Sequence, residues 1–179
     1  LSPERNIDSY QSAGELVIDW AGGKVRPSHE MGFFNPKPGG PWWEVVYAVH
    51  DYERDLDLST GIATTRFTCR NVRQQREHFC SKPDDLICTR IVFDSGKGDL
   101  DLNLQREQDV QSRVATPDGH LLMTGRLTRG GMRFALLLQA RVTGGKLIAD
   151  EDCLRVRGAD AVELRLAVAT SYVAPGDLS

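Results

Sequence analysis

The sequence predicts an all-β protein, built as a sandwich of antiparallel strands, and two observations support this fold class. Leucine alternates with aspartate or asparagine from Asp99 to Leu104, and this period of two is typical of a half-buried strand. Turn residues rich in Gly, Pro and Asp separate the apolar segments at intervals of roughly 8–12 residues, as in β-sandwiches. No segment shows a convincing helical period.

Further strands are expected along the chain on the same grounds. Residues 55–58 repeat the alternation of Asp with Leu and predict another half-buried strand. Residues 86–93 form a nearly continuous apolar run, which is typical of a strand that is covered on both faces. Three more strands are expected at residues 121–127, 133–142 and 162–170.

Residues 133–142 also fit a helix by composition, because alanine, leucine and glutamine are good helix formers. Glycine pairs bound this segment on both sides, and the surrounding segments follow the rhythm of strands. We therefore expect a strand here rather than a helix.

Residues 21–43 break the strand rhythm with many Gly and Pro residues and four large aromatics. Loops of this length are usually functional or disordered, and aromatic residues argue against simple disorder. Trp42 and Trp43 are candidates for a glycan-stacking platform, since indole rings are flat and rigid. The favoured interpretation is that they anchor the loop on their own domain or on a partner. A strand that starts at Trp43, with Val45 and Tyr47 on the same face, fits either interpretation.

The composition indicates one soluble, globular domain over residues 1–179, with 40% hydrophobic and 26% charged residues. A net charge of -3 gives no electrostatic reason to expect a nucleic acid or an anionic membrane as partner. The four cysteines form no C-x-x-C pair, and the expected turns do not place them opposite one another. We expect buried free thiols, with a bridge to Cys153 left open.

Four motifs follow one another along the chain: YQSAGELVID at residues 10–19, HDYERDLDLSTGIA at 50–63, REHFCSKPDDLI at 76–87 and LRVRGADAVELRLAVATS at 154–171. In this order they resemble the N-terminal β-sandwich domain of family 95 glycoside hydrolases, the α-L-fucosidase-like enzymes. Two departures from the family pattern are the long segment at 21–43 and Ser12, where the family favours Pro.

The resemblance implies a β-supersandwich of the galactose-mutarotase-like type that is itself non-catalytic. Such a domain would pack on an (α/α)6 catalytic domain of the same natural chain and shape its substrate entrance. The parent would be an inverting exo-glycosidase for an α-fucosyl or related glycan, secreted or periplasmic. The chain starts at Leu1 without Met and ends at Ser179 without closure, so we expect both ends to be boundaries of a fragment.

We expect no catalytic residue, cofactor or metal in this chain. Glycoside hydrolysis needs two carboxyl groups, one of them with a raised pKa. The pairs Asp55 with Asp57 and Asp99 with Asp101 lie opposite the leucines of their strands, on the solvated face, without apolar neighbours. The four histidines have no metal-binding spacing, and Leu104 stands where a calcium loop beginning at Asp99 would need Gly.

Candidate substrate or domain-interface residues are Tyr10 and Gln11 in the first motif and Trp42 and Trp43 in the long loop, which we expect to lie toward the catalytic domain. Arg76 and Glu77 should face opposite sides of their strand, each with a partner on a neighbouring strand. A stand-alone carbohydrate-binding module and a purely structural docking domain remain alternatives.

Overall fold

A computed structural model describes residues 11–21, 24–27, 46–94, 97–128 and 131–172. Every regular element in these residues is a β-strand, which confirms the all-β fold class. Residues 133–142 lie within strand β10, so the helix that their composition allowed does not form. The glycine-bounded strand rhythm was the better guide because propensity is overridden when a segment pairs with neighbours on both sides.

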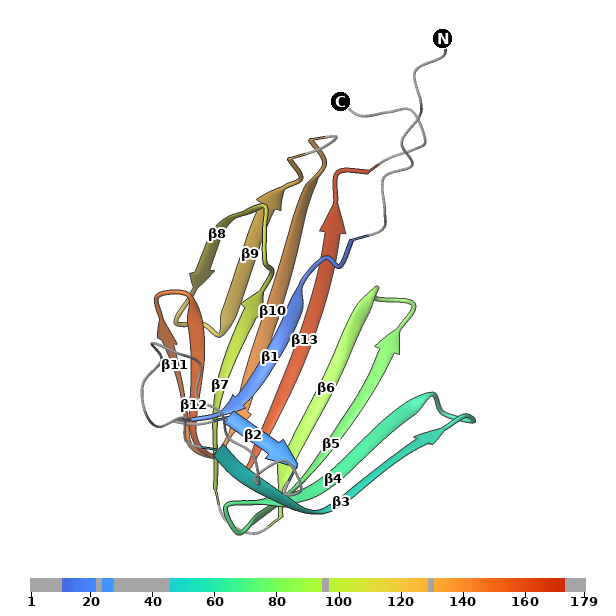
Figure 1. The fold of residues 1–179 in the computed structure, drawn as a ribbon, viewed down its shortest axis with the longest axis vertical. Helices are drawn as coiled ribbons and strands as arrows, with labels where there is room; N and C mark the ends of the chain where they lie inside the picture. Colours follow the sequence, from blue (N-terminus) through green and yellow to red (C-terminus); the bar gives the residue numbers. More distant parts are fainter. Residues whose placement is uncertain (1–10, 22–23, 28–45, 95–96, 129–130, 173–179) are drawn as a thin grey trace, which may run out of the picture.

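The strands form two sheets that pack as a sandwich (Figure 1). The small sheet has the order β1-β7-β12-β11, and the large sheet has the order β2-β3-β4-β5-β6-β13-β10-β9-β8. All pairs are antiparallel except β2 with β3, which is parallel. The small sheet comprises β1 (Glu15–Trp20), β7 (Gly98–Gln105), β11 (Lys146–Asp150) and β12 (Cys153–Ala159). The large sheet comprises β2 (Lys24–Pro27), β3 (Val46–Asp57), β4 (Ile62–Cys69), β5 (Val72–Ser81), β6 (Leu86–Phe93), β8 (Val110–Ala115), β9 (His120–Arg126), β10 (Arg133–Thr143) and β13 (Ala161–Thr170).

The hydrophobic core lies between the two sheets. Leu100, Leu102 and Leu104 of β7 are fully buried, as their alternation with Asp and Asn predicted. They share one buried cluster with Leu138 of β10, and β7 and β12 contact strands β8, β9 and β10. The small sheet therefore covers the half of the large sheet that is built from its late strands.

The other half of the large sheet, strands β3 to β6, extends beyond the small sheet (Figure 1). This changes the burial expected for residues 55–58, because Leu56 is 58% exposed and Leu58 is 87% exposed. The sequence pattern correctly indicated a strand, but the prediction of a half-buried strand is wrong, since no strand of the small sheet covers this end of β3 in the described structure. In β6, Ile91 and Phe93 are buried while Arg90 is exposed, so the strand is not fully covered on both faces as expected.

Part of the expected long loop is regular, because β2 pairs with β3 at the edge of the large sheet. Trp42 and Trp43 lie outside the described residues, as does the start of the alternative strand at Trp43. The cysteine registers agree with the expected geometry: Cys69 lies opposite Val72 and Cys80 opposite Ile87. All four thiols are free, Cys153 among them, but only Cys69 is buried and Cys80 is exposed, so the expectation of buried thiols is wrong for Cys80.

Two adjacent leucines of β10 test the assignment of its faces. Leu138 is fully buried in the core, and Leu137 is 41% exposed on the outer face. We expect Leu138→Ala to lower the free energy of unfolding by about 2–5 kcal/mol, because it leaves a cavity. Leu137→Ala should cost much less, about 1 kcal/mol or below. Urea denaturation of both variants checks this, and equal losses would contradict the face assignment.

Candidate functional site

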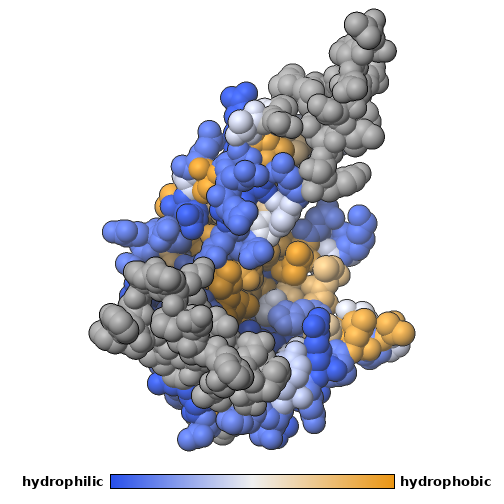
Figure 2. All heavy atoms as spheres, in the orientation of Figure 1, coloured by the Kyte–Doolittle hydropathy of each residue, from blue (hydrophilic) through white to orange (hydrophobic). Residues whose placement is uncertain are grey.

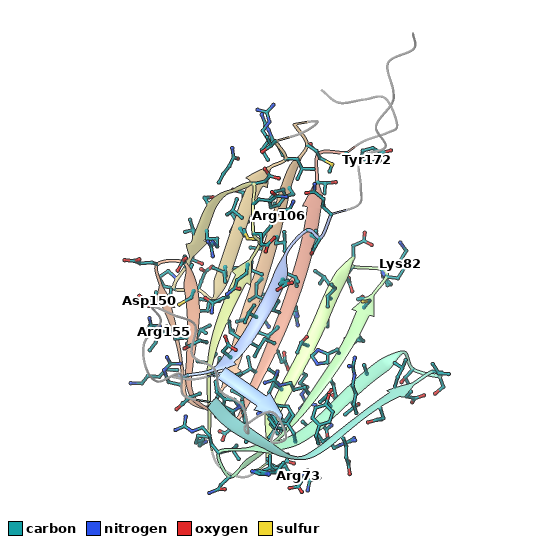
Figure 3. All side chains as sticks on the ribbon, in the orientation of Figure 1. Arg73, Lys82, Arg106, Asp150, Arg155 and Tyr172 are labelled. Atoms are coloured by element: carbon teal, nitrogen blue, oxygen red, sulfur yellow. The ribbon has the colours of Figure 1, made fainter. Side chains whose placement is uncertain are left out.

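Arg106, directly after β7, connects the segment that precedes β1 to the core (Figure 3). Its Nη2 donates to the side-chain oxygen of Gln11 at 2.8 Å, and its Nη1 donates to the carbonyl of Ser12. Its guanidinium also lies over the ring of Phe134, 4.7 Å from the centroid, and pairs with Asp109 at 3.8 Å. The Arg106 and Asp109 side chains are only 7% and 10% exposed, so this is a nearly buried ion pair.

An open groove of about 690 Å³ lies beside Arg106. The groove includes Gln11, which is the one expected site residue that the structure describes. Tyr10 lies outside the described residues. The described lining residues are polar and charged, and none of them is aromatic: Gln11, Ser12, Gly14, Glu15, Gln105, Arg106, Glu107, Gln108 and Arg113. These described residues therefore offer no flat apolar surface on which a sugar ring stacks.

A second surface is formed by the part of the large sheet that the small sheet leaves open. We call it the open face and define it by the side chains of β3 to β6 that point to the inner side of the sheet beyond the small sheet. Cross-strand pairing places these side chains in rows, because residues directly opposite each other share a face. The open face consists of Tyr52, Arg54, Leu56, Thr65, Phe67, Arg76, His78, Cys80 and Ile87.

The open face combines exposed apolar groups with cations. Tyr52 is 59% exposed and Ile87 is 45% exposed. Figure 2 shows apolar side chains gathered in a hollow near the middle of the view. Arg54 and Arg76 lie in one cross-strand row, on either side of Thr65, and His78 lies in the next row. None of the described inner-face positions of β3 to β6 carries a carboxylate.

Arg76 is held in a fixed position on this face. Its Nε donates to the side-chain oxygen of Gln74 at 2.9 Å, and its guanidinium lies 5.2 Å from the centroid of the Phe67 ring. Tyr52 stacks on the same ring with a centroid distance of 6.3 Å. Burial lowers the pKa of Arg76 to about 10, and the charge of Asp19 on β1 only partly opposes this shift.

His78 lies one row further out on β5, and its Nδ1 is 2.9 Å from the hydroxyl of Thr89 on β6. Burial lowers the pKa of His78, and the positive charges of Arg76 and Arg54 lower it further. The neutral form of His78 is therefore favoured in the folded domain.

The opposite face of the same strands has a different chemistry. Arg66 of β4 donates to Asp55 at 3.1 Å and to Gln75 at 2.9 Å, and Gln75 donates to Glu77 at 2.8 Å. Arg76 and Glu77 face opposite sides as expected. Arg76 has the expected partner on a neighbouring strand, the Phe67 ring of β4, as well as Gln74 on its own strand. For Glu77 the expectation is wrong, because its hydrogen-bond partner Gln75 lies on the same strand. The outer face therefore contains carboxylates beside its cations, with Arg66 paired to Asp55, whereas the described positions of the open face carry cations alone.

The acid pairs have structural roles. Asp101 pairs with Arg157 at 2.8 Å, and Asp99 accepts the amide hydrogen of Gly158 at 2.7 Å, where β12 bulges. Asp150, the last residue of β11, pairs with Arg155 of β12 (Figure 3). Hydrogen bonds from Ser59 hold the pKa of Asp57 below its ordinary value, the reverse of what a general acid needs. No cluster of three metal-ligating side chains occurs among the described residues.

Residues 43–175 match the family described as "Glycosyl hydrolase family 65, N-terminal domain". The chain belongs to this family of N-terminal domains.

The chain is also similar to alpha-L-fucosidase 2 of Arabidopsis thaliana, with 27% identity over 154 residues, covering 72% of this chain and 18% of that protein. A solved structure, a putative kojibiose phosphorylase from human microbiome, has a similar fold, with a TM-score of 0.50 and 10% identity over 72% of this chain and 21% of that one. The chain thus spans about a fifth of the length of these two proteins. The predicted resemblance to the N-terminal domain of a glycoside hydrolase is confirmed. The motifs resembled those of family 95, whereas the family model that matches is that of family 65.

Within the described residues, no helix is long and apolar enough to cross a membrane.

Arg106 should be essential for the stability of the domain. We expect Arg106→Met to lower the free energy of unfolding by about 3–5 kcal/mol, because it leaves Asp109 without its nearly buried partner. Arg113→Met is the matched control: Arg113 is 37% exposed and its nearest carboxylate is 4.0 Å away, so a loss of at most about 1 kcal/mol is expected. Denaturant unfolding compares the two variants. A small loss of unfolding free energy in Arg106→Met would show that the contacts of Arg106 are dispensable for stability.

His78 should make the domain less stable in mild acid. Above about pH 6.5, the ordinary histidine pKa, His78 is neutral in both states and contributes no pH dependence. As the pH falls below this value, the unfolded chain takes up the proton first, so the free energy of unfolding decreases until the lowered folded pKa is passed. Melting temperatures measured at several pH values should fall less steeply in His78→Gln, and Arg54→Gln should reduce the slope in part. An unchanged slope in His78→Gln would rule this out.

Proposed function

We propose that this domain is the non-catalytic N-terminal part of a glycoside hydrolase resembling α-L-fucosidases, and that it packs on the catalytic domain that follows it. In this arrangement it shapes the substrate entrance of an (α/α)6 barrel that acts on an α-fucosyl or related glycan. The partner is then the rest of the same natural chain. Support for a longer parent comes from the two similar proteins, of which this chain spans about a fifth.

The observation that carries the proposal is the open face. Tyr52, Leu56 and Ile87 are each about half exposed on one side of one sheet. Large apolar side chains gathered on one surface are typical of sites where another protein surface binds. Apolar side chains also gather in a hollow of the surface (Figure 2), which would give a neighbouring domain room to insert. Tyr10, Trp42 and Trp43 remain candidates for the same contact.

Gln11 has a different role in this proposal. Its side-chain oxygen accepts a hydrogen bond from the nearly buried Arg106, so we assign it to holding the segment before β1 rather than to substrate.

One observation favours a second candidate, a stand-alone carbohydrate-binding module. Tyr52 is 59% exposed and is supported from behind by Phe67, which is the arrangement of a stacking platform. Arg54, in the row beside Phe67, would supply hydrogen-bond donors for sugar hydroxyl groups. Tyr52→Ala would then abolish binding of fucose or galactose to the isolated domain in calorimetry, whereas a docking face predicts no measurable affinity to lose.

The domain by itself should not hydrolyse glycosides, because the paired acids are engaged in structural contacts. Assays with aryl fucosides and aryl galactosides should give no turnover above a blank. If turnover occurs, Asp55→Asn and Asp101→Asn distinguish the domain from a contaminating enzyme. Activity that disappears in one of these variants would show that the chain contains a catalytic pair.

The docking face is tested in the full-length enzyme with two matched variants. Ile87→Asp places a charge on the open face, and Leu137→Asp places one on the outer face, at similar exposures of 45% and 41%. We expect Ile87→Asp to split a single thermal transition into two, because buried charge disrupts domain packing. Leu137→Asp should leave one transition, and the opposite result would assign docking to the outer face.

A further inference from the structure

Arg76 presents an incomplete set of hydrogen bonds to the open face. Its Nε is used by Gln74, and the Phe67 ring fixes the plane of the guanidinium. No hydrogen bond or ion pair joins its Nη1 or Nη2 to any described residue. The end of the guanidinium that presents two parallel N–H groups is therefore available, and this is the end that matches a carboxylate in a bidentate pair.

Gln74 provides an independent sign that an acceptor is missing at this place. The residue is fully buried, and its Nε2 has no hydrogen-bond partner among the described residues. The orientation of its amide is determined, because the oxygen must accept from the Nε of Arg76. Trp20, which contacts Phe93 beside Gln74, also has a buried Nε1 without a partner in the described structure. Donors exceed acceptors in this part of the sandwich, although buried polar groups are normally paired.

The charges around Arg76 make the lack of an anion more severe. Arg54 lies in the same cross-strand row as Arg76, and His78 lies in the next row. The described inner-face positions of β3 to β6 contain no carboxylate. Asp19 is near enough to act on Arg76 electrostatically, but it forms no ion pair with it within the described residues. A cation that loses its water without gaining an anion is costly, as its lowered pKa reflects.

Arg66, on the same strand pair, shows what a completed site looks like in this domain. It lies on the outer face and has both a carboxylate, Asp55 at 3.1 Å, and an amide oxygen, Gln75 at 2.9 Å. Arg76 has the amide oxygen of Gln74 at the same distance but lacks the carboxylate. The contrast indicates that the anion for Arg76 comes from outside the described strands.

We propose that Arg76 receives the carboxylate of an Asp or Glu side chain from the domain that follows this one in the natural chain. This inference rests on the proposed docking of that domain and specifies its chemistry: an apolar segment with one central acid. The apolar part would cover Tyr52, Leu56 and Ile87, and the acid would insert between Gln74 and His78 to meet the Nη groups. An arginine that has no anion among the described residues, on a face that also exposes apolar groups, selects for such a partner, because any segment without an acid leaves the cation buried and uncompensated.

The test uses the full-length enzyme and two matched arginine variants. Arg76→Met should split the single thermal transition into two in calorimetry and should abolish the effect of salt on domain docking. Arg66→Met removes an equally charged side chain from the same strand pair, and one transition should remain. Arg76→Lys keeps the charge but loses the two-pronged geometry, so an intermediate separation of the transitions is expected; this variant also serves if Arg76→Met fails to fold.

The outcomes separate this inference from the proposal on which it rests. If Ile87→Asp splits the transition and neither Arg76 variant does, docking occurs on the open face but the carboxylate pair does not form. If none of these variants splits it, both ideas are wrong. The acid could also come from a sugar, so galacturonate and galactose are added separately to the enzyme. A melting temperature raised by galacturonate alone, and not in Arg76→Met, would assign the site to an acidic saccharide and overturn the protein carboxylate.

Discussion

The small sheet covers the late strands of the large sheet and only the adjoining part of the early ones, and the rest of the structure depends on this unequal overlap. Where the two sheets meet, β7 and β10 bury their leucines completely and form the core. Where the small sheet ends, the same sheet continues with Tyr52, Leu56 and Ile87 only partly covered. A four-stranded layer cannot cover a nine-stranded one. The surplus area either stays in water, at a cost that grows with its apolar surface, or is covered by another domain.

The pattern of single strands was predictable from the sequence, but the position of each strand in the sandwich was not. Alternation in β7 and β3 looks the same along the chain, yet Leu102 is fully buried and Leu56 is 58% exposed. Period-two patterning reports that a strand has two different faces. Whether a second layer covers one of them depends on long-range sheet order, which local residues do not encode. For the same reason, β2 escaped prediction: four residues with a proline form a strand only because the edge of β3 is available.

Of the four expected site residues, Gln11 is the one that lies among the described residues. Gln11 was identified from its motif, and the structure connects it to Arg106, a residue that no motif pointed to. Arg76 and His78 were visible in the sequence as members of one strand face, two residues apart. What the sequence could not show was that Arg54 and Phe67 come from other strands to the same place, since cross-strand rows follow from register. A signal was present in the run Gln74, Arg76 and His78, three polar side chains on the face that β6 makes apolar with Ile91 and Phe93.

Arg106 and Arg76 show how the same side chain can stabilise a domain or prepare it for a partner. Both lie against a phenylalanine ring, and both use an amide oxygen of a glutamine. Arg106 also has Asp109 and the carbonyl of Ser12, so its charge is compensated inside the domain. Arg76 has no such anion among the described residues, and it lies at the margin of the core where the small sheet ends. A buried charge that has no counter-ion in its own domain destabilises that domain when it is isolated. In a docking surface, the same charge gives a strong preference for one complementary acid.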